Sequence, residues 1–330
     1  MSDAEKWTVW VPEPIAESGL DMLRKIATVI GPSSAEADEH GVRTPLAENA
    51  VDAVIVRTRE IDAATIARSE RLQVIAKHGV GLDNIDVDTA TRHGVIVTRT
   101  PGQNVTAVSE HTIGMLFALR KRFLPATYDI REGVWNRSSY IAPELSGDTL
   151  GVIGLGAIGE AVANRAMCFG MDVVGVDPYV DPSSVPEGVT LLDSVAAVAE
   201  AADALTVHVP LTEETEGVIG ADELALLPPS GVVINCARGG IVDETALHEA
   251  LIDGTIAGAG LDVFLREPVE PNHPLLSHDN VLVTPHCAGS SVEALDGMAI
   301  AAVEDVHAVL SGRVPPSAVN AAAIDERSGR

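Results

Sequence analysis

The 330-residue chain contains few cysteines and few basic residues, and both shortages exclude classes of protein. Its three cysteines, Cys168, Cys236 and Cys287, are odd in number and lack C-x-x-C spacing. This argues against a disulfide framework and a structural metal site, and it fits a reducing cytoplasm. Lys and Arg number 22 against 48 Asp and Glu, a net charge of −26 without any basic run. We therefore expect no nucleic acid or anionic membrane as partner, because the electrostatic attraction is missing.

Long apolar segments and targeting signals are also missing. No charge-free apolar run of 18 residues occurs, which argues against a membrane span, and the N-terminus MSDAEKWTVW is not a signal peptide. The acidity is typical either of a salty cytoplasm or of a surface tuned for solubility, and we favour the second. With 46% hydrophobic residues, and at roughly 100 to 200 residues per domain, the length predicts two domains with a sizeable core.

Short β-branched runs alternate with helix-like segments along the whole chain, which is typical of parallel sheets covered by helices on both faces. One such helix is expected at 61–69, with Asp62 as its cap. In the first third of the chain, strands are predicted at 7–11, 53–56, 73–76 and 95–98. In a second series, strands are predicted at 150–153, 172–176, 204–207, 231–235, 256–261 and 280–283. Six such strands complete a doubly wound sheet.

Two long helical patterns indicate where the chain passes between domains. Residues 108–123 are predicted as one continuous helix with Ser109 as N-cap, and residues 292–310 as another, closed by Gly312. The predicted fold class is α/β, with two doubly wound parallel-sheet domains. Residues 107–296 form a Rossmann dinucleotide-binding domain, whereas 1–106 and 297–330 form a flavodoxin-like substrate domain to which the C-terminal tail returns.

A glycine-rich segment lies between a predicted strand and a predicted helix. It reads Gly154-Leu155-Gly156-Ala157-Ile158-Gly159, and in this context its backbone can turn tightly and present N–H groups to a pyrophosphate at a helix N-terminus. Asp177 ends the next strand, 18 residues beyond Gly159, near the spacing of a ribose-binding carboxylate. Residues 178–180 carry no cation that would offset its repulsion of a 2′-phosphate. The prediction is NAD, in preference to NADP.

Polar clusters follow three consecutive predicted strands, which places them at one edge of the sheet. They contain Arg238, Glu267 and His286. Hydride transfer between a nicotinamide and a 2-oxo acid needs a proton donor for the nascent alkoxide, a cation for the carboxylate and a group that holds the donor correctly protonated. We assign these roles to His286, Arg238 and Glu267 respectively.

These segments together resemble the D-isomer-specific 2-hydroxyacid dehydrogenase family over nearly the whole chain. The matching motifs are GLGAIG with Asp177, HVPLTEET, NCARGG, DVFLREP, TPHCAGS, KHGVGLDNID and TPGQNVTAVSEHTIG. The resemblance implies that Arg238, Glu267 and His286 are catalytic and that backbone N–H groups at Val80 and Gly81 bind the substrate carboxylate. It also implies that the cofactor is lined by Thr106, His208, Pro210, Thr215, Cys236, Ala237, Asp262 and Gly289. We interpret Cys236 and Cys287 as packing residues, and no metal site is expected.

The substrate is less sharply defined by the sequence. Arg57-Thr58-Arg59 is similar to the Arg-Ser-Arg segment of phosphoglycerate dehydrogenases, and its two guanidinium groups can hold a phosphate or can simply be solvated. Lys77 replaces the arginine usual in that branch and is more similar to glyoxylate or hydroxypyruvate reductases. We take 3-phosphoglycerate as the leading candidate, with hydroxypyruvate and glyoxylate as alternatives. Because the chain stops soon after Asn320, no regulatory domain is expected.

The resemblance admits two other interpretations. Formate dehydrogenases carry glutamine where this chain has Glu267, so that branch is discounted. An NAD-sensing corepressor on the same fold retains Arg, Glu and His, but such proteins usually add disordered tails, which are short here. The resemblance also implies a homodimer, for which we expect contacts through the Trp135 region and the helix at 108–123.

Overall fold

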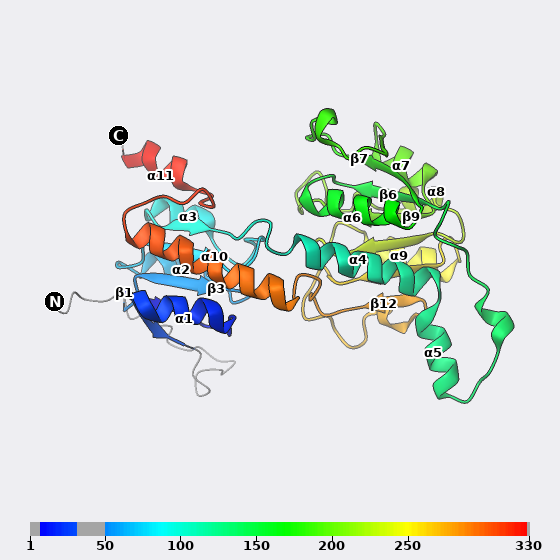
Figure 1. Ribbon diagram of the computed structural model, residues 1–330, viewed down its shortest axis with the longest axis horizontal. Coiled ribbons are helices and arrows are strands. Elements are labelled where there is room, and N and C mark those ends of the chain that lie inside the picture. Colours follow the sequence, from blue (N-terminus) through cyan, green and yellow to red (C-terminus); the bar gives the residue numbers. More distant parts are fainter. Residues whose placement is uncertain (1–6, 32–49, 329–330) are drawn as a thin grey trace. The chain divides into compact units, whose positions relative to one another are not determined.

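The computed structural model describes residues 7–31 and 50–328, and the chain divides into two compact units (Figure 1). Unit 1 contains residues 1–104 and 291–330, and unit 2 contains residues 105–290. The predicted boundaries, 106/107 and 296/297, fall inside the two long helices α4 (Val105–Arg120) and α10 (Val292–Leu310). The structure instead keeps each helix whole, because each packs along its length within one unit.

Unit 1 is built on a five-stranded parallel sheet in the order β2-β1-β3-β4-β5. Its strands are β1 (Trp7–Trp10), β2 (Ala27–Ile30), β3 (Ala53–Val56), β4 (Val74–Lys77) and β5 (Ile96–Thr98). Besides α10, its helices are α1 (Glu17–Ile26), α2 (Ala63–Ala67), α3 (Val87–Arg92) and α11 (Ala321–Ser328). This is the flavodoxin-like strand order, so the predicted fold class of this half is confirmed.

Alternation along β3 divides the core of unit 1 into two layers. Ala53 and Ile55 pack in the layer beneath α1 and α10, whereas Val54 and Val56 pack in the opposite layer with residues of α2 and α3. Figure 1 shows α1 and α10 side by side on one face of the sheet. Such two-sided burial is expected of a parallel sheet. The tail is tied to β5 by Asn320, whose Oδ1 accepts a hydrogen bond from the N–H of Val97 at 2.9 Å.

Unit 2 is built on a seven-stranded parallel sheet in the order β12-β11-β10-β9-β6-β7-β8. Its strands are β6 (Thr149–Ile153), β7 (Asp172–Val176), β8 (Val189–Leu191), β9 (Ala204–Val207), β10 (Val232–Asn235), β11 (Gly258–Leu261) and β12 (Val281–Val283). Its further elements are α5 (Phe123–Arg131), η1 (Arg137–Tyr140), α6 (Ala157–Cys168), η2 (Pro182–Ser184), α7 (Val195–Ala201), α8 (Ala221–Leu226), α9 (Glu244–Ile252) and η3 (Pro274–Ser277). The order reverses between β6 and β9, which is the Rossmann switch point. The predicted doubly wound fold is therefore confirmed here too.

Several predicted details differ from the structure. The helix expected at 108–123 begins at Val105 and ends at Arg120, because Arg122 adopts a left-handed φ of 56° that separates α4 from α5. Ser109 is not its N-cap: it is buried inside α4, where its hydroxyl donates to the carbonyl of Thr106. Strands β2 and β8 and helix α11 had no individual prediction. By contrast, α10 has the predicted bounds, and Asp62 caps α2 by accepting a bond from the N–H of Thr65. Among the described residues, no helix is both long and apolar enough to cross a bilayer.

Candidate active site

The glycine-rich turn between β6 and α6 gives each of its three glycines a different task. Gly154 has a φ of +90°, a conformation that L side chains rarely adopt, and its turn begins the loop. Gly156 precedes α6, and a Cβ there would point into open space at the helix N-terminus. A Cβ on Gly159 would lie 1.9 Å from the carbonyl oxygen of Gly154, so only glycine permits this packing. These features are those of a dinucleotide-binding turn, in which the second glycine leaves room for a pyrophosphate.

Asp177 lies directly after β7 and is tied to this turn. Its Oδ2 accepts a hydrogen bond from the N–H of Leu155 at 2.9 Å, and its Oδ1 accepts one from the N–H of Tyr179 at 2.9 Å. The two bonds fix the carboxylate beside the glycine-rich turn, where a ribose-binding acid is expected. Ala157 is the first residue of α6, and Ile158 packs against the core beneath it.

Loops that follow β10 and β11 lie against one another at the same edge of the sheet. A Cβ on Gly239 would lie 2.0 Å from the backbone of Phe264, which shows how closely the two loops approach. The Arg238 loop is shaped by Asn235, whose amide donates to the carbonyl of Arg238 at 2.8 Å and accepts from the N–H of Ala237 at 3.0 Å. Arg238 itself donates from Nη1 to the carbonyl of Ala237 at 2.7 Å. This contact orients the guanidinium group.

Glu267 and His286 meet directly. Nδ1 of His286 lies 2.7 Å from Oε2 of Glu267, while Oε1 of the same carboxylate accepts a bond from the N–H of Phe264 at 3.0 Å. Because an ionised carboxylate only accepts hydrogen bonds, Nδ1 carries the proton and Nε2 is the nitrogen left for exchange. Both side chains are partly exposed, His286 at 47% and Glu267 at 36%. The pair can therefore reach a substrate.

His286 adopts a left-handed backbone conformation, with φ at 50°. Such a φ is uncommon for a residue other than glycine and persists only where the surroundings enforce it. Here Asp262 does so, because it is 1% exposed and the turn folds around it. Its carboxylate accepts bonds from the N–H groups of Cys287 and Ala288, each at 2.8 Å, and its carbonyl accepts the N–H of His286 at 2.7 Å.

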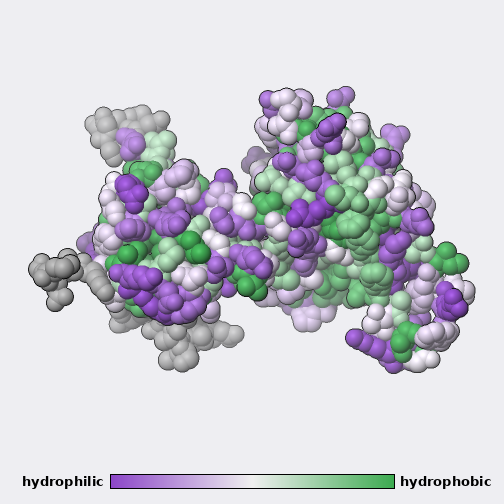
Figure 2. Space-filling view, in the orientation of Figure 1, coloured by the Kyte–Doolittle hydropathy of each residue, from purple (hydrophilic) through white to green (hydrophobic). Residues whose placement is uncertain are grey.

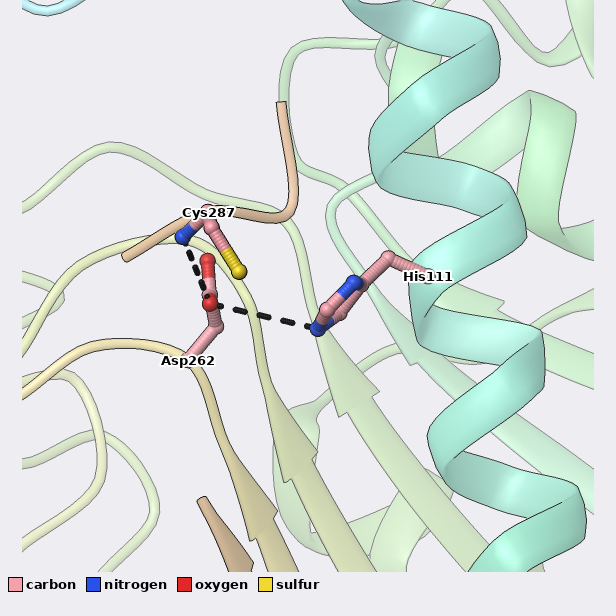
Figure 3. Close-up of side chains that lie close together, drawn as sticks. All are labelled: His111, Asp262 and Cys287. Atoms are coloured by element: carbon pink, nitrogen blue, oxygen red, sulfur yellow. Dashed lines mark hydrogen bonds and ion pairs between the residues drawn. The ribbon is translucent and has the colours of Figure 1, made fainter. Parts of the chain in front are cut away.

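Asp262 also belongs to a cluster with His111 of α4 and Cys287 (Figure 3), whose potential ligand atoms lie within 4.8 Å of one another. The donor chemistry does not fit a metal. Thr284 donates its hydroxyl proton to Oδ1 of Asp262 at 2.5 Å, so its oxygen accepts from Nε2 of His111 at 3.0 Å. Nε2 therefore carries a proton and offers no lone pair, and both oxygens of Asp262 are already hydrogen-bonded. Burial and nearby Asp262 raise the pKa of the Cys287 thiol, which disfavours the thiolate that a metal binds.

The remaining predicted cofactor residues occupy the same unit. Thr106 lies in the first turn of α4, and Gly289 follows the His286 turn. After β9, Thr215 donates its hydroxyl to the carbonyl of Pro210 at 2.6 Å and closes that loop. His208 has its Nε2 2.9 Å from the hydroxyl of Thr206, whereas its buried Nδ1 has no partner within the described parts of the chain. Burial lowers the pKa of His208 to about 3, so this imidazole is neutral near pH 7.

Cys236 is a packing residue. Its side chain is buried, its Sγ lies 3.8 Å from Sδ of Met115, and burial raises its pKa to about 12. A thiol with so high a pKa is inert as a nucleophile.

The five predicted substrate residues all lie in unit 1. The N–H groups of Arg57, Thr58 and Arg59 converge on Glu13, whose carboxylate also accepts the hydroxyl of Thr58. Burial alone would raise the pKa of Glu13, but the bonds from Thr58 and its neighbours outweigh it and lower that pKa. The carboxylate is thus ionised near pH 7 and occupies the backbone donors of this loop.

Side chains of the same loop are held as well. Arg57 donates to the carbonyl of Pro14 at 3.0 Å, and the guanidinium group of Arg59 lies 5.4 Å from the centre of the Trp10 ring. Lys77 donates to the carbonyl of Arg57 and to the side chain of Asn84. The structure therefore brings Arg57, Arg59 and Lys77 together around one loop.

Val80 and Gly81 follow β4 in the adjoining loop. Neither N–H group forms a hydrogen bond with another of the described residues. Both donors are therefore available to an anion, as the predicted role in binding a carboxylate requires.

Three residues of these networks were missed from the sequence: Glu13, His111 and Thr284. A signal existed for His111, which interrupts the apolar pattern of α4 with a polar side chain four residues before Met115. Thr284 begins the motif TPHCAGS and His111 lies in the motif TPGQNVTAVSEHTIG, but neither motif assigns a role to these two side chains. Glu13 precedes a proline in an acidic sequence and could not be distinguished from the other surface carboxylates.

Comparison with known proteins identifies the family. Residues 113–288 match the family model described as D-isomer specific 2-hydroxyacid dehydrogenase, NAD binding domain. The D-3-phosphoglycerate dehydrogenase of Methanocaldococcus jannaschii is 39% identical over 317 residues, covering 94% of this chain and 59% of that protein. The glyoxylate reductase of Thermofilum pendens is 38% identical and covers 94% of both chains.

A solved structure agrees with these matches. The NADPH-dependent glyoxylate/hydroxypyruvate reductase of Sinorhizobium meliloti, in complex with NADP and malonate, superimposes with a TM-score of 0.82. It is 34% identical and covers 96% of this chain and 97% of that one. The chain spans only 51 to 60% of the length of three D-3-phosphoglycerate dehydrogenases that it matches. The protein belongs to the D-isomer specific 2-hydroxyacid dehydrogenase family, and its unit 2 contains that family's NAD-binding domain.

Proposed function

We propose that this protein interconverts a small D-2-hydroxy acid and its 2-oxo acid by hydride transfer with NAD. The observation that carries the proposal is the 2.7 Å contact between Nδ1 of His286 and Oε2 of Glu267 at the edge of a dinucleotide-binding sheet. An acid–base histidine held by a carboxylate is the arrangement that carbonyl reduction requires. A bound nicotinamide supplies or accepts the hydride.

The proton is assigned to Nε2 of His286. In the direction of reduction, the imidazolium gives this proton to the developing alkoxide, and in oxidation the neutral Nε2 takes it from the hydroxyl. Glu267 keeps the proton on Nδ1 and stabilises the imidazolium. Arg238 binds the substrate carboxylate and polarises its carbonyl through a planar fork of donors. Proton movement and charge stabilisation are thus divided among three side chains.

The cofactor preference is proposed from Asp177. Its carboxylate is fixed by two backbone N–H groups and suits ribose hydroxyls, whereas it repels a 2′-phosphate. No Lys or Arg follows in residues 178–180. We therefore propose NAD as the cofactor, even though a reductase of similar structure from Sinorhizobium meliloti is NADPH-dependent.

3-Phosphoglycerate is the leading substrate, and hydroxypyruvate and glyoxylate are the alternatives. Arg57 and Arg59 favour the phosphate-bearing acid. Glu13 favours the smaller acids, because its ionised carboxylate occupies the N–H donors of their loop and repels a phosphate. The relatives support both substrates, since D-3-phosphoglycerate dehydrogenases favour the phosphate-bearing acid and a glyoxylate reductase favours the smaller acids.

The test is NADH consumption over 3-phosphohydroxypyruvate, hydroxypyruvate and glyoxylate, repeated with NADPH and with Arg57→Ala and Arg59→Ala. Turnover with one of the three acids and NADH supports the proposed activity, and turnover with none of them refutes it. A selective rise in KM for the phosphate-bearing acid in the arginine variants assigns phosphate binding to this loop. Equal or absent effects make the smaller acids the substrates.

We also propose a cytoplasmic location, because the three cysteines form no disulfide and lack C-x-x-C spacing, as in a reducing compartment.

A homodimer completes the proposal. None of the residues of α5 is buried, and the segment around it exposes Tyr128 at 65%, Trp135 at 79% and Ile141 at 85%. Figure 2 shows hydrophobic residues gathered on the face of unit 2 that carries α4. Self-association through these surfaces removes them from water. Sedimentation velocity should give a dimer that Trp135→Glu dissociates, and a monomeric wild-type protein would refute the dimer.

A further inference from the structure

We infer that His111 is a positioning residue, which holds the turn of His286 through Thr284 and Asp262. The inference rests on the proposed function and extends it to a residue of α4 that contacts neither member of the His286–Glu267 pair in any hydrogen bond. Figure 3 shows His111 directed from α4 toward Asp262 and Cys287.

The chemistry of the donors and acceptors fixes the direction of the hydrogen bonds that link His111, Thr284 and Asp262. Asp262 can only accept, so the hydroxyl proton of Thr284 points to its Oδ1 at 2.5 Å. The oxygen of Thr284 then accepts from Nε2 of His111 at 3.0 Å. Nε2 of His111 also lies 3.9 Å from Oδ1 of Asp262. Each donor in this series of hydrogen bonds therefore has one acceptor, and His111 is the donor farthest from the His286 turn.

The last hydrogen bonds of the series join Asp262 to the turn that carries His286. The same Oδ1 accepts the N–H of Cys287 at 2.8 Å, and Oδ2 accepts the N–H of Ala288 at 2.8 Å. These two amides follow His286 directly, and Thr284 precedes it by two residues. The carboxylate of Asp262 thus holds the turn on both sides of His286, the residue that has the left-handed φ.

Removing the outer donor should loosen this turn. Without His111, Thr284 loses the partner that holds its hydroxyl toward Asp262, and the hydroxyl can rotate away. Oδ1 of Asp262 would then lose its hydrogen bond from Thr284 and would hold the turn only through the N–H of Cys287. Because a misplacement of a reacting group by about 1 Å can cost up to about 100-fold in rate, we expect a smaller displacement of His286 to lower kcat about tenfold.

The experiment compares His111→Ala with His111→Gln, whose amide offers an N–H near the position of Nε2. Kinetics use NADH and the best 2-oxo acid from the panel above, and NADH binding is followed by fluorescence. His111→Ala should lower kcat about tenfold, with NADH affinity within about twofold of wild type, and His111→Gln should restore most of the rate. The neighbouring solvent-facing Glu110→Ala on the same helix is the control and should leave kcat unchanged.

A double-mutant cycle separates positioning from general loss of stability. Thr284→Val removes the hydroxyl at constant shape, and Thr284→Ser keeps it. If His111 acts through Thr284, the double variant His111→Ala with Thr284→Val should be no slower than the slower single variant. Multiplied losses would overturn the inference, as would a His111→Ala variant within twofold of wild-type kcat or one that loses NADH affinity in proportion.

Crystal structures of wild-type and His111→Ala protein give a reading that needs no turnover. Displacement of residues 284–288 supports the inference even if none of the three acids is a substrate, whereas an unchanged turn refutes it. Inactivity of the wild-type protein would refute only the proposed function, so the two failures remain distinguishable.

Discussion

Replacing Glu267 with glutamine isolates the charge of the His286–Glu267 pair. The amide keeps the shape of the side chain and an oxygen that can still accept from the N–H of Phe264. At Nδ1 of His286, however, an acceptor 2.7 Å away becomes a donor or an uncharged acceptor. The variant therefore loses stabilisation of the imidazolium and the preference for a proton on Nδ1.

The size of the effect follows from the kind of bond. A hydrogen bond to a charged group contributes about 1.5 to 3 kcal/mol, which corresponds to about 10- to 150-fold in kcat/KM. Because His286 is 47% exposed and Glu267 36% exposed, solvent screening places the expectation near the lower end. We therefore expect Glu267→Gln to lower kcat/KM for the 2-oxo acid by about tenfold or more, at unchanged NADH affinity.

The assay is steady-state NADH oxidation, combined with fluorescence titration of NADH. Glu270→Gln is the matched control, since it removes an exposed carboxylate three residues further along the same loop. A Glu267→Gln variant within threefold of wild type would show that the pair is not used in turnover, whatever its geometry.

Three other predictions concern the cofactor and the stability of the fold. Asp177→Ser should lower the ratio of kcat/KM for NADH over NADPH by about tenfold or more, because it removes a carboxylate that repels the 2′-phosphate. The ratio is measured side by side with both cofactors, and an unchanged ratio would mean that Asp177 does not exclude the phosphate. The pKa of His208 is about 3 in the folded protein but near 6.5 in the unfolded chain. Between these pH values the unfolded state binds more protons, so the free energy of unfolding falls as the pH drops below 6.5. The loss is about 2 kcal/mol at pH 5 relative to pH 7. Denaturant titrations of wild type and His208→Gln at pH 7 and pH 5 check this, and equal pH dependence in both would contradict it. Gly159→Ala should destabilise the protein by about 3 kcal/mol or more in thermal denaturation, because its Cβ would lie 1.9 Å from the carbonyl oxygen of Gly154. The control is Gly114→Ala in α4, where a Cβ meets nothing within 4 Å, and it should raise the free energy of unfolding by about 0.5 to 1 kcal/mol.

Much of the fold could be predicted because the two sheets are parallel and buried on both faces. Fully buried strands such as β3 and β10 appear in the sequence as short apolar runs between turns. The sequence does not predict strand β2, because α1 ends at Ile26 and β2 begins at Ala27 with no turn between them. Strand β8 is a three-residue edge strand with no buried residue, so its identity depends on pairing with β7.

The break between α4 and α5 also depends on tertiary structure. Pro125 lies three residues after Arg122 and is compatible with the first turn of a new helix. No glycine or asparagine stands at or beside Arg122, however, so the sequence does not indicate that this residue is left-handed. In the structure, the guanidinium group of Arg122 donates to the carbonyl of Ser139 and lies 5.5 Å from the centre of the Tyr140 ring. These contacts come from residues far along the chain, which periodicity cannot register.

For the site, the sequence predicts which residues gather but not how they bond. Arg238, Glu267 and His286 follow consecutive strands, so their common edge is predictable from topology. The contact between Nδ1 and the carboxylate, and the turn around Asp262, depend on loop conformations that no periodicity encodes. Their catalytic roles, and those of the cofactor and substrate residues, stay predictions until variants are measured.

The most direct test of the central claim is His286→Gln, measured by rapid-mixing reduction of the preferred 2-oxo acid by bound NADH. If Nε2 of His286 transfers the proton, the rate should fall by about 10²- to 10⁴-fold while NADH binds within about twofold of its wild-type affinity. A variant that reduces the acid at the wild-type rate would contradict the account.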